Sequence, residues 1–229
     1  MLFSPPQFLY KYLSQEGAQN LFDSEYPSIR FSLPRTFNDP YDVNPSGSSS
    51  SHGLDAIGVL CLCETPTSIP MWGHYGYGKV DNEVFKKSSN VHGGGVALEF
   101  STNSEFFKKY NLIKVKYNTN RPTIKCSPRE QLAVKSKEWA YEREWRCFTD
   151  LWDEQHVAKN GRIDFISIPF PFEALTKVIH GYDSMVSTSG FLSRLESRHI
   201  QEQVCRLDSK SYQIDIVDLD DISHLTRGY

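Results

Sequence analysis

The chain has 229 residues, of which 39% are hydrophobic and 13% aromatic, and its 25 basic and 28 acidic residues give a net charge of −3. That length fits one sizeable domain, and the balanced charge argues against a broad electrostatic surface for duplex nucleic acid while leaving room for a local basic patch. The sequence shows no basic leader before an apolar run and no stretch of roughly 20 apolar residues that could span a bilayer. We therefore expect a cytoplasmic protein with no membrane partner.

The first third of the chain predicts strands separated by one helix and one fixed turn. Alternating or continuous apolar residues indicate strands at 8–12, 29–33 and 57–64. Ser14 is a suitable N-cap for a helix that runs through Phe22. The Asn38-Asp39-Pro40 sequence favours a fixed turn, because Asn and Asp side chains bond the local backbone and proline bars helix at the residue before it. Residues 46–53 are serine-rich and are expected to form a flexible loop.

The remaining two thirds mix helices and strands without regular alternation. Predicted helices cover 67–75, 102–110, 127–139 and 184–207, and predicted strands cover 96–100, 112–117, 142–148, 164–168 and 212–219. Ser127, Pro128 and Glu130 form a capping box that marks the clearest helix start. Residues 77–92 are polar and indicate an insertion loop, whereas 184–229 are expected to form a C-terminal helix and strand. We expect an α+β fold of one domain over 1–229, with mixed, mostly antiparallel sheets and flanking helices.

The most informative stretch is 135–146, where two acids lie two residues apart among arginine and aromatic residues. If this stretch is extended, Glu142, Glu144 and Arg146 project from one face as an acid–acid–base row. Like charges at this spacing repel unless an arginine or a ligand compensates them, which is typical of sites of chemistry. The alternative is an ion-paired, solvated strand edge anchored by core tryptophans, because exposed acid–arginine pairs are common and individually weak.

A second patch, Met71 to Gly76, places an indole, an imidazole and a phenol within four positions, at Trp72, His74 and Tyr75. Stacking aromatic rings beside a hydrogen-bonding histidine suit a planar ring such as nicotinamide or a nucleobase. An aromatic cluster that seals the core, with His74 hydrogen-bonded, fits the same residues equally well.

Several segments in this order resemble the DUF2971 family of bacterial and phage-associated proteins. They are Leu9-Tyr10-Lys11-Tyr12, Phe37-Asn38-Asp39-Pro40, 60–64, Met71-Trp72-Gly73-His74-Tyr75, 95–100 and Lys135…Trp139…Glu142-Arg143-Glu144-Trp145-Arg146. The resemblance spans about residues 9–181, and the stretch between Tyr75 and His92 is longer here than in the family. The order of elements in that family is in turn similar to that of ADP-ribosyltransferase folds.

The resemblance implies a NAD-consuming enzyme with Glu144 as the catalytic acid and Glu142 as its partner towards the acceptor. The residues that it implies for binding NAD are Lys11, Tyr12, Asn38, Trp72, His74, Tyr75 and Arg146. Lys11 stands where those enzymes use His or Arg. A carboxylate beside the ribose would stabilise an oxocarbenium-like transition state, and Arg146 would keep Glu144 ionised and oriented. We therefore expect transfer of ADP-ribose to a protein or nucleic acid, or hydrolysis of NAD, by a toxin or phage-defence effector.

Two other functions fit the same residues. A non-catalytic module could bind a nucleotide or nucleic acid, with Trp72, His74 and Tyr75 as a stacking platform and arginines on phosphate. A metal-dependent nuclease could use Asp39, Glu142 and Glu144 as ligands, although turns and ion pairs explain acids at those spacings equally well. No Walker loop, Gly-x-Ser-x-Gly elbow or His-Glu-x-x-His motif is present in the sequence, which lowers the NTPase, hydrolase and zincin interpretations.

Overall fold

The structure is a computed structural model that describes residues 4–47, 53–82, 87–123, 125–151, 164–194 and 200–219. Contacts divide the chain into two compact units, each made of three separate segments. Unit 1 comprises Met1–Gln7, Ser28–Glu64 and Thr102–Phe170, and unit 2 comprises Phe8–Pro27, Thr65–Ser101 and Pro171–Tyr229. Each unit has its own paired strands and its own buried apolar residues. The single domain over 1–229 stays a prediction.

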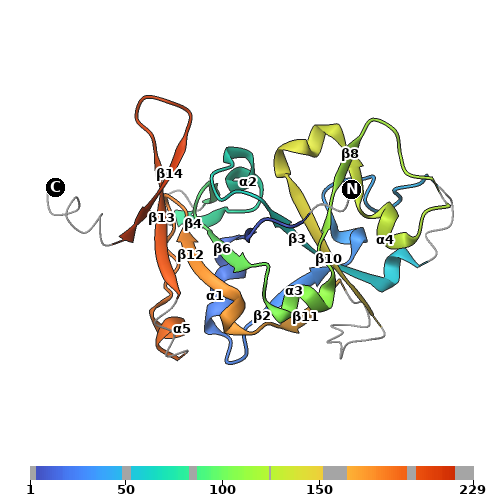
Figure 1. The fold of residues 1–229 in the computed structure, drawn as a ribbon. Coiled ribbons are helices and arrows are strands. Elements are labelled where there is room, and N and C mark those ends of the chain that lie inside the picture. Colours follow the sequence, from blue (N-terminus) through green and yellow to red (C-terminus); the bar gives the residue numbers. More distant parts are fainter. Residues whose placement is uncertain are drawn as a thin grey trace, which may run out of the picture. The chain divides into compact units, whose positions relative to one another are not determined.

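Unit 1 contains an antiparallel sheet with its strands in the order β11–β2–β3–β10–β7. Figure 1 labels four of them, β2, β3, β10 and β11. Its strands are β2 (Ser28–Ser32), β3 (Ile57–Cys63), β7 (Ile113–Lys114), β10 (Glu144–Asp150) and β11 (Phe165–Pro169). A parallel pair joins β8 (Lys116–Asn118) to β9 (Val134–Ser136). The helices are α3 (Glu105–Tyr110), α4 (Pro128–Gln131) and the 3-10 helices η1 (Pro34–Thr36), η2 (Leu54–Ala56) and η3 (Lys137–Glu142).

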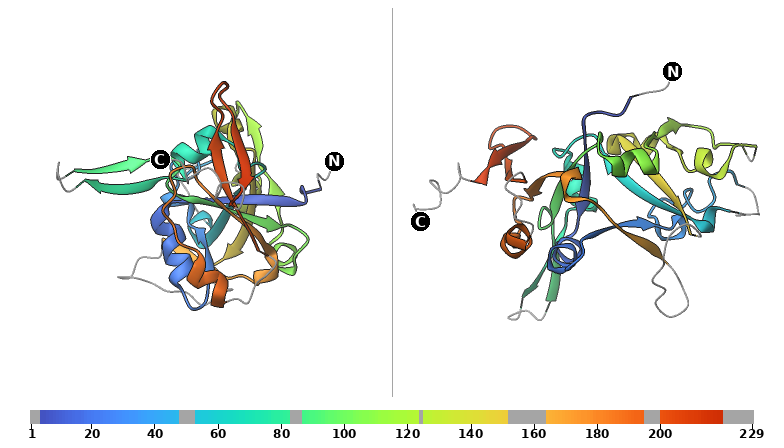
Figure 2. Two further views of the ribbon diagram at one scale, coloured as in Figure 1. Left: turned by 90° about the vertical axis from the view of Figure 1, so that its left-hand side faces the viewer. Right: turned by 60° about the horizontal axis from the view of Figure 1, so that its bottom comes forward.

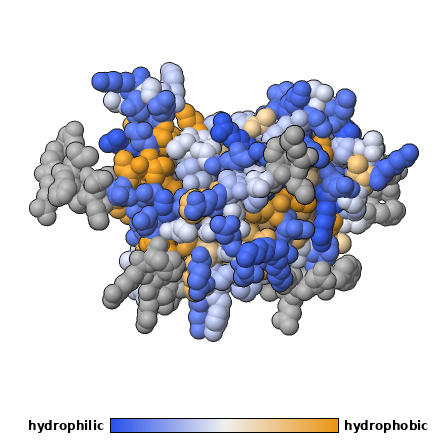
Figure 3. All heavy atoms as spheres, viewed as in Figure 1, coloured by the Kyte–Doolittle hydropathy of each residue, from blue (hydrophilic) through white to orange (hydrophobic). Residues whose placement is uncertain are grey.

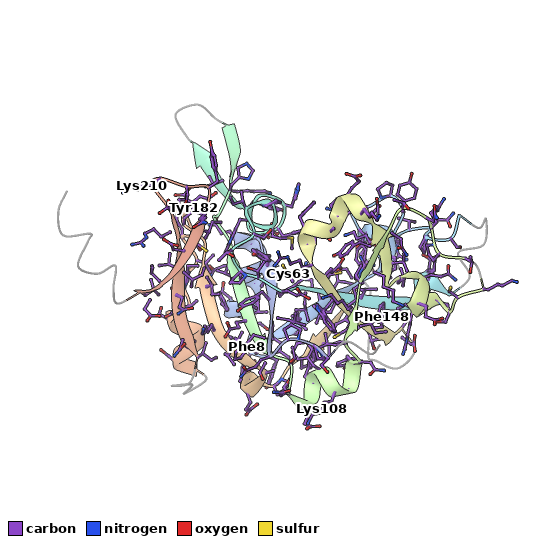
Figure 4. The ribbon with its side chains drawn as sticks, turned by 45° about the horizontal axis from the view of Figure 1, so that its top comes forward. Phe8, Cys63, Lys108, Phe148, Tyr182 and Lys210 are labelled. Atoms are coloured by element: carbon purple, nitrogen blue, oxygen red, sulfur yellow. The ribbon has the colours of Figure 1, made fainter. Side chains whose placement is uncertain are left out.

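Strands β3 and β10 form the centre of unit 1 and pair antiparallel along seven residues each. Figure 4 labels Cys63 on β3 and Phe148 on β10. Almost every residue of both strands is buried. One apolar cluster packs around Phe148 and includes Val59 and Leu132. The burial of β10 on both faces matters for function, because its polar residues are then inside the protein.

Unit 2 contains strands in the order β1–β6–β12–β13–β14, antiparallel except for the parallel pair β12–β13. These strands are β1 (Phe8–Leu13), β6 (Val96–Ser101), β12 (Leu175–His180), β13 (Gln201–Leu207) and β14 (Ile214–Asp218). Strands β4 (Gly78–Asn82) and β5 (Lys87–Val91) form a separate antiparallel pair, seen as two green arrows in Figure 2. The helices are α1 (Gln15–Asp23), α2 (Ile69–His74), α5 (Ser189–Arg194) and the 3-10 helix η4 (Phe172–Ala174).

Aromatic residues fill the interior of unit 2. The rings of Phe22 on α1 and Phe191 on α5 lie 4.7 Å apart between their centroids. Leu9 and Trp72 are also buried, with at most 1% of either residue exposed. Figure 3 shows apolar spheres on this unit over β13 and β14, where Leu207 is about half exposed.

The predicted α+β class is confirmed, because both units combine mostly antiparallel strands with short helices. The ADP-ribosyltransferase-like arrangement stays a prediction. The predicted N-caps of two helices are also confirmed. Ser14 caps α1 by accepting a hydrogen bond from the backbone N–H of Gly17, and Ser127 and Glu130 form the predicted capping box at α4.

Three sequence predictions are wrong, each because strand pairing overrides a local pattern. The insertion loop at 77–92 contains β4 and β5, whose polar composition hid the strand pattern. The helix predicted to reach Trp139 ends at Gln131, since the following residues pair with β8 as β9. The long helix over 184–207 is α5 followed by β13, which pairs with β12; residues 195–199 of that prediction, including His199, lie outside the described residues. Residues 48–52 of the predicted flexible loop also lie outside them.

Candidate functional site

The predicted site residues fall into two groups that belong to different units. Asn38, Glu142, Glu144 and Arg146 are in unit 1, whereas Lys11, Tyr12, Trp72, His74 and Tyr75 are in unit 2. Within each unit the residues can be placed by their own contacts. A common cleft formed by both groups stays a prediction.

The expected acid–acid–base row is only partly formed, because the chain turns between the two acids. Glu142 is the last residue of η3, and Arg143 adopts a left-handed conformation with φ of 45° that ends this helix. β10 begins one residue later, at Glu144. Glu144 and Arg146 therefore share one face of a strand, while Glu142 reaches the same place from the helix.

Arg146 is the centre of this group and is fully buried, with 0% of it exposed. Its Nε and Nη2 donate to the two oxygens of Glu144 at 2.8 and 3.1 Å. Its Nη1 and Nη2 donate to the two oxygens of Asp42 at 2.8 and 3.0 Å, and Nη1 also donates to the Leu132 carbonyl at 2.6 Å. These bonds use all five N–H groups of a guanidinium. Arg146 therefore keeps no N–H for a ligand in this arrangement.

Lys135 of β9 links Glu142 to the other two acids, Glu144 and Asp42. Its Nζ lies 2.6 Å from Glu142, 3.5 Å from Glu144 and 4.0 Å from Asp42, and 4.5 Å above the ring of Trp139. We call Asp42, Lys135, Glu142, Glu144 and Arg146 the Arg146 cluster. All five residues are buried. With three carboxylates against two cations, the cluster has one excess negative charge when every group is ionised.

In this cluster, ion pairing outweighs burial in setting the pKa values of Glu144 and Lys135. Burial by itself raises the pKa of Glu144, but Arg146 and then Lys135 overcome it and hold that pKa at about 2. Burial likewise lowers the pKa of Lys135, whereas Glu144 and Glu142 raise it further, so the net pKa is above its usual value. Both groups are therefore charged at neutral pH. The alternative of a solvated strand edge is wrong, because these charges are inside the protein.

A pocket of about 250 Å³ lies beside the Arg146 cluster and shares two residues with it, Asp42 and Lys135. It is mostly polar. The remaining lining residues are Asp39, Tyr41, Pro45, Asn118, Thr119, Asn120, Arg121, Pro122, Val134 and Ser136. We call it the Asp39 pocket. Glu142 and Glu144 do not line it; both contact Lys135, which does, and Arg146 links Glu144 to Asp42.

Asp39 is the one carboxylate of this pocket wall that is left with an unused oxygen. The predicted turn holds it in place: its Oδ1 accepts from the backbone N–H of Tyr41 at 2.9 Å, and its carbonyl accepts from the N–H of Asp42 at 3.1 Å. Its Oδ2 is buried and has no hydrogen-bond partner among the described residues. A buried acceptor left without a donor costs about 1–3 kcal/mol, which a hydrogen bond from an ordered water or a ligand would recover.

In the aromatic patch of unit 2, Trp72 is packed inside the protein against Tyr12. Trp72 is 1% exposed, and its indole N–H donates to the Pro66 carbonyl at 2.8 Å. Its ring meets that of Tyr12 edge-on at 5.0 Å, and the Tyr12 hydroxyl donates to the Thr65 carbonyl. Neither ring is therefore a free face for stacking, which corrects the platform interpretation for Trp72.

Three further predicted residues of unit 2 lie nearer the surface, where His74 is exposed and Tyr75 and Lys11 are partly exposed. A pocket of about 350 Å³ in the same unit lies at the start of α1. Its polar groups bond to the protein itself, since Gln15 accepts from the N–H of Lys79 and Ser14 accepts from that of Gly17. Although this pocket is larger, it lacks the unused buried acceptor that distinguishes the Asp39 pocket.

Sequence reasoning missed Asp42 and Lys135 as parts of the site and used Asp39 only as a candidate metal ligand. The available signal was the turn sequence itself, in which a second acid follows Asp39 by three residues. In the described ranges, no three His, Cys, Asp or Glu side chains are arranged to hold a metal ion. Asn38, predicted to contact NAD, is exposed beside the pocket wall and does not line it.

Comparison of the chain with models of protein families, with curated proteins and with solved structures finds no match. The resemblance to the DUF2971 family therefore stays a prediction. Within the described residues, every helix is too short or too polar to cross a membrane.

Proposed function

We propose that unit 1 holds the substrate site of a NAD-consuming enzyme, with the nicotinamide-ribose end of NAD in the Asp39 pocket. The observation that carries the proposal is the buried Oδ2 of Asp39, which lacks a partner in the described structure. An oxygen of this kind accepts a hydrogen bond or faces a positive charge. Nicotinamide in NAD offers both, because its ring is cationic and its carboxamide carries N–H donors.

The acids near Asp39 support a cationic group at that residue. The Arg146 cluster has one excess negative charge when every group is ionised, and Asp39 adds another acid, while Arg121 is a cation that also lines the pocket. Few counter-charges or waters screen buried groups, so their field acts strongly on a ligand a few ångströms away. Breaking the nicotinamide–ribose bond spreads positive charge over the ribose ring, and a fixed negative field favours that transition state.

These features suggest roles that differ from those implied by the resemblance. Asp39 is the proposed catalytic residue, because it is the carboxylate that lines the pocket with an oxygen to spare. Glu144 and Arg146 are positioning residues, since Glu144 fixes the guanidinium that holds both oxygens of Asp42 at the pocket wall. The glycosidic C–N bond breaks, nicotinamide leaves with the bonding electrons as a neutral molecule, and an acceptor oxygen bonds to the ribose carbon and loses a proton.

The size of the pocket limits what it can hold. Pockets that enclose a drug-sized ligand usually measure about 300–1,000 Å³, whereas this one measures about 250 Å³. It therefore suits the nicotinamide-ribose end, and the adenosine part of NAD would extend beyond it. Water is the simplest acceptor, and a protein or nucleic acid is the alternative acceptor that the same reaction allows.

The experiment is to incubate the protein with NAD, with and without candidate macromolecular acceptors, and to measure released nicotinamide. We expect release by the wild type and a loss of about 100-fold or more in Asp39→Asn, which keeps the turn but removes the charge. Asp150→Asn is the matched control, because Asp150 is a partly exposed acid of the same unit, paired with Arg129. It should leave the rate unchanged.

Binding separates the catalytic proposal from its non-catalytic alternative. Calorimetric titration with nicotinamide riboside, which carries the cationic ring and ribose, should give binding that Asp39→Asn removes. Binding without release of nicotinamide from NAD would support a ligand-binding module instead of an enzyme. If neither binding nor release is observed, the proposed function is wrong.

A further inference from the structure

Arg121 on the wall of the Asp39 pocket is held in a fixed position by neighbouring backbone. Its Nε donates to the Pro45 carbonyl at 3.0 Å, and its Nη2 donates to the Asn44 carbonyl. The guanidinium also lies 5.0 Å from the ring centroid of Tyr41. Gly47, at φ of +72°, lets the backbone pass close by, since a Cβ there would lie 2.9 Å from Nη1. The side chain is thus pre-organised, which reduces the entropy lost when it binds a ligand.

The positive charge of Arg121 is not neutralised within the described part of the chain. Its partners there are two carbonyls and one aromatic ring, and no described carboxylate pairs with it. Its Nη1 carries two N–H groups that neither carbonyl bond uses. Arg121 itself is exposed. An exposed, immobilised guanidinium with spare donors is a suitable partner for a phosphate or carboxylate.

The pocket is therefore lined by both an acid and a cation with unused hydrogen-bonding groups. Asp39 is 1% exposed and has an oxygen without a partner in the described structure, whereas Arg121 is exposed and has unused N–H groups. Asn118, Thr119 and Asn120 also line the pocket and supply neutral groups that can bond hydroxyls. One small ligand with opposite charges at its two ends would satisfy both residues.

We propose that the Asp39 pocket binds a bipolar ligand, with a cationic or N–H-donating end on Asp39 and an anionic oxygen group on Arg121. This inference rests on the proposed function, because it takes the Asp39 pocket as the substrate site. It adds that the anionic group, which is a phosphate in a nucleotide, is recognised directly by the protein. Arg121 is then a specificity-determining residue.

The test compares three probes by calorimetric titration at low salt. Nicotinamide riboside carries only the cationic end, nicotinamide mononucleotide adds one phosphate, and inorganic phosphate carries only the anionic end. The mononucleotide should bind the wild type about tenfold or more tightly than the riboside, since a charge-assisted bidentate bond is worth at least the 1.4 kcal/mol of one decade. Inorganic phosphate should bind weakly, and its binding should be lost in Arg121→Gln.

Substitutions of Arg121 test whether this residue causes the preference for the mononucleotide over the riboside. Arg121→Gln should weaken the mononucleotide about tenfold and leave the riboside within about twofold, while Arg121→Lys, which keeps the charge without the planar fork, should fall in between. Lys116→Gln is the control, because Lys116 is an exposed cation of β8 that does not line the pocket. Thermal unfolding of each variant establishes that the loop at Asn44 and Pro45 still folds, and Arg121→Lys carries the test if Arg121→Gln does not.

The outcomes distinguish this inference from the proposed function. Equal affinity for riboside and mononucleotide, with no effect of either Arg121 variant, overturns the bipolar ligand but leaves riboside binding at Asp39 intact. Loss of riboside binding in Asp39→Asn supports the proposed function whatever Arg121 does. If Lys116→Gln weakens the mononucleotide as much as Arg121→Gln, the effect comes from general surface charge and the inference is wrong.

Discussion

The Arg146 cluster and the adjoining pocket wall at Asp39 differ in how completely their buried acids are hydrogen-bonded. In the cluster, five charged residues are joined by close contacts, and Arg146 uses all five of its N–H groups. At the wall, Asp39 is just as buried but has an oxygen without a partner in the described structure. The comparison separates charged residues whose hydrogen bonds are complete from an acid that keeps one oxygen without a partner among the described residues. Burial and charge alone would have made Glu144 and Asp39 equal candidates for catalysis.

The largest expected effect comes from removing the cation at the centre of the cluster. Arg146→Met fills similar space but leaves Asp42 and Glu144 buried without their main partner, so the free energy of unfolding should fall by about 3–5 kcal/mol. Urea denaturation at pH 7 measures it. Arg129→Met is the matched control, because Arg129 pairs with Asp150 in the same unit with both side chains partly exposed. It should cost less than about 1 kcal/mol, and equal effects of the two variants would contradict a special role for the cluster.

The second prediction concerns the pH dependence that Glu144 contributes. Folding lowers its pKa from the ordinary value of 4.5 to about 2. A lowered carboxyl pKa stabilises the folded state above pH 4.5, and that contribution is lost as the pH falls from there towards 2. From this shift, the wild type should lose about 2 kcal/mol between pH 7 and pH 3 that Glu144→Gln does not lose.

The measurement is a set of urea titrations at both pH values for each protein. Glu138→Gln serves as control, because Glu138 is an exposed acid of η3 and should keep the pH dependence of the wild type. The pairing of Glu144 with Arg146 is wrong as an electrostatic account if Glu144→Gln follows the wild-type curve.

The third prediction tests Asp39, the buried acid with an oxygen that lacks a partner in the described structure. Asp39→Asn removes a buried charge with an unused oxygen but keeps the Oδ1 that accepts from the Tyr41 N–H. Without ligand, the variant should be as stable as the wild type or more stable by about 1–2 kcal/mol, because less desolvation cost remains. Thermal and urea unfolding without added ligand give the answer. A marked loss of stability would assign Asp39 to the packing of the protein and remove the main support for the pocket as a binding site.

Much of the fold was predictable where the signal is local. Ser14 and Ser127 mark the starts of helices, because their side chains accept hydrogen bonds from backbone N–H groups three residues later. The side chain of Asp39 likewise accepts a backbone hydrogen bond within the turn at Asp39-Pro40. The errors arose where distant pairing decided between helix and strand. Residues 134–136 form β9 because β8 lies alongside, and residues 201–207 form β13 because β12 does.

The candidate site was predictable only in part, for the same reason. The short spacing of Glu142, Glu144 and Arg146 correctly indicated that these charges interact. However, Arg146 also bonds Asp42, which lies 104 positions earlier in the chain, and no pattern around 135–146 points to it. Which acid is satisfied and which is left over depends on such long-range partners. The sequence therefore indicated a group of interacting charges, and the catalytic role that the resemblance implies for Glu144, whose two oxygens both accept from Arg146, stays a prediction.

The smallest expected effect concerns Arg121, another residue that lines the pocket. Gly47→Ala should cost about 1 kcal/mol of stability, because alanine is strained at positive φ, and its Cβ would also push against Nη1 of Arg121. Gly53→Ala is the matched control: Gly53 has φ of +92° in the same unit, but a Cβ there would meet only Pro128, at 3.6 Å. Both variants should lose similar stability, whereas Gly47→Ala alone should weaken nicotinamide mononucleotide several-fold in calorimetric titration. Equal binding by the two variants would mean that the exact position of Arg121 does not matter, and the fixed guanidinium would then be another charge the protein keeps for its own packing.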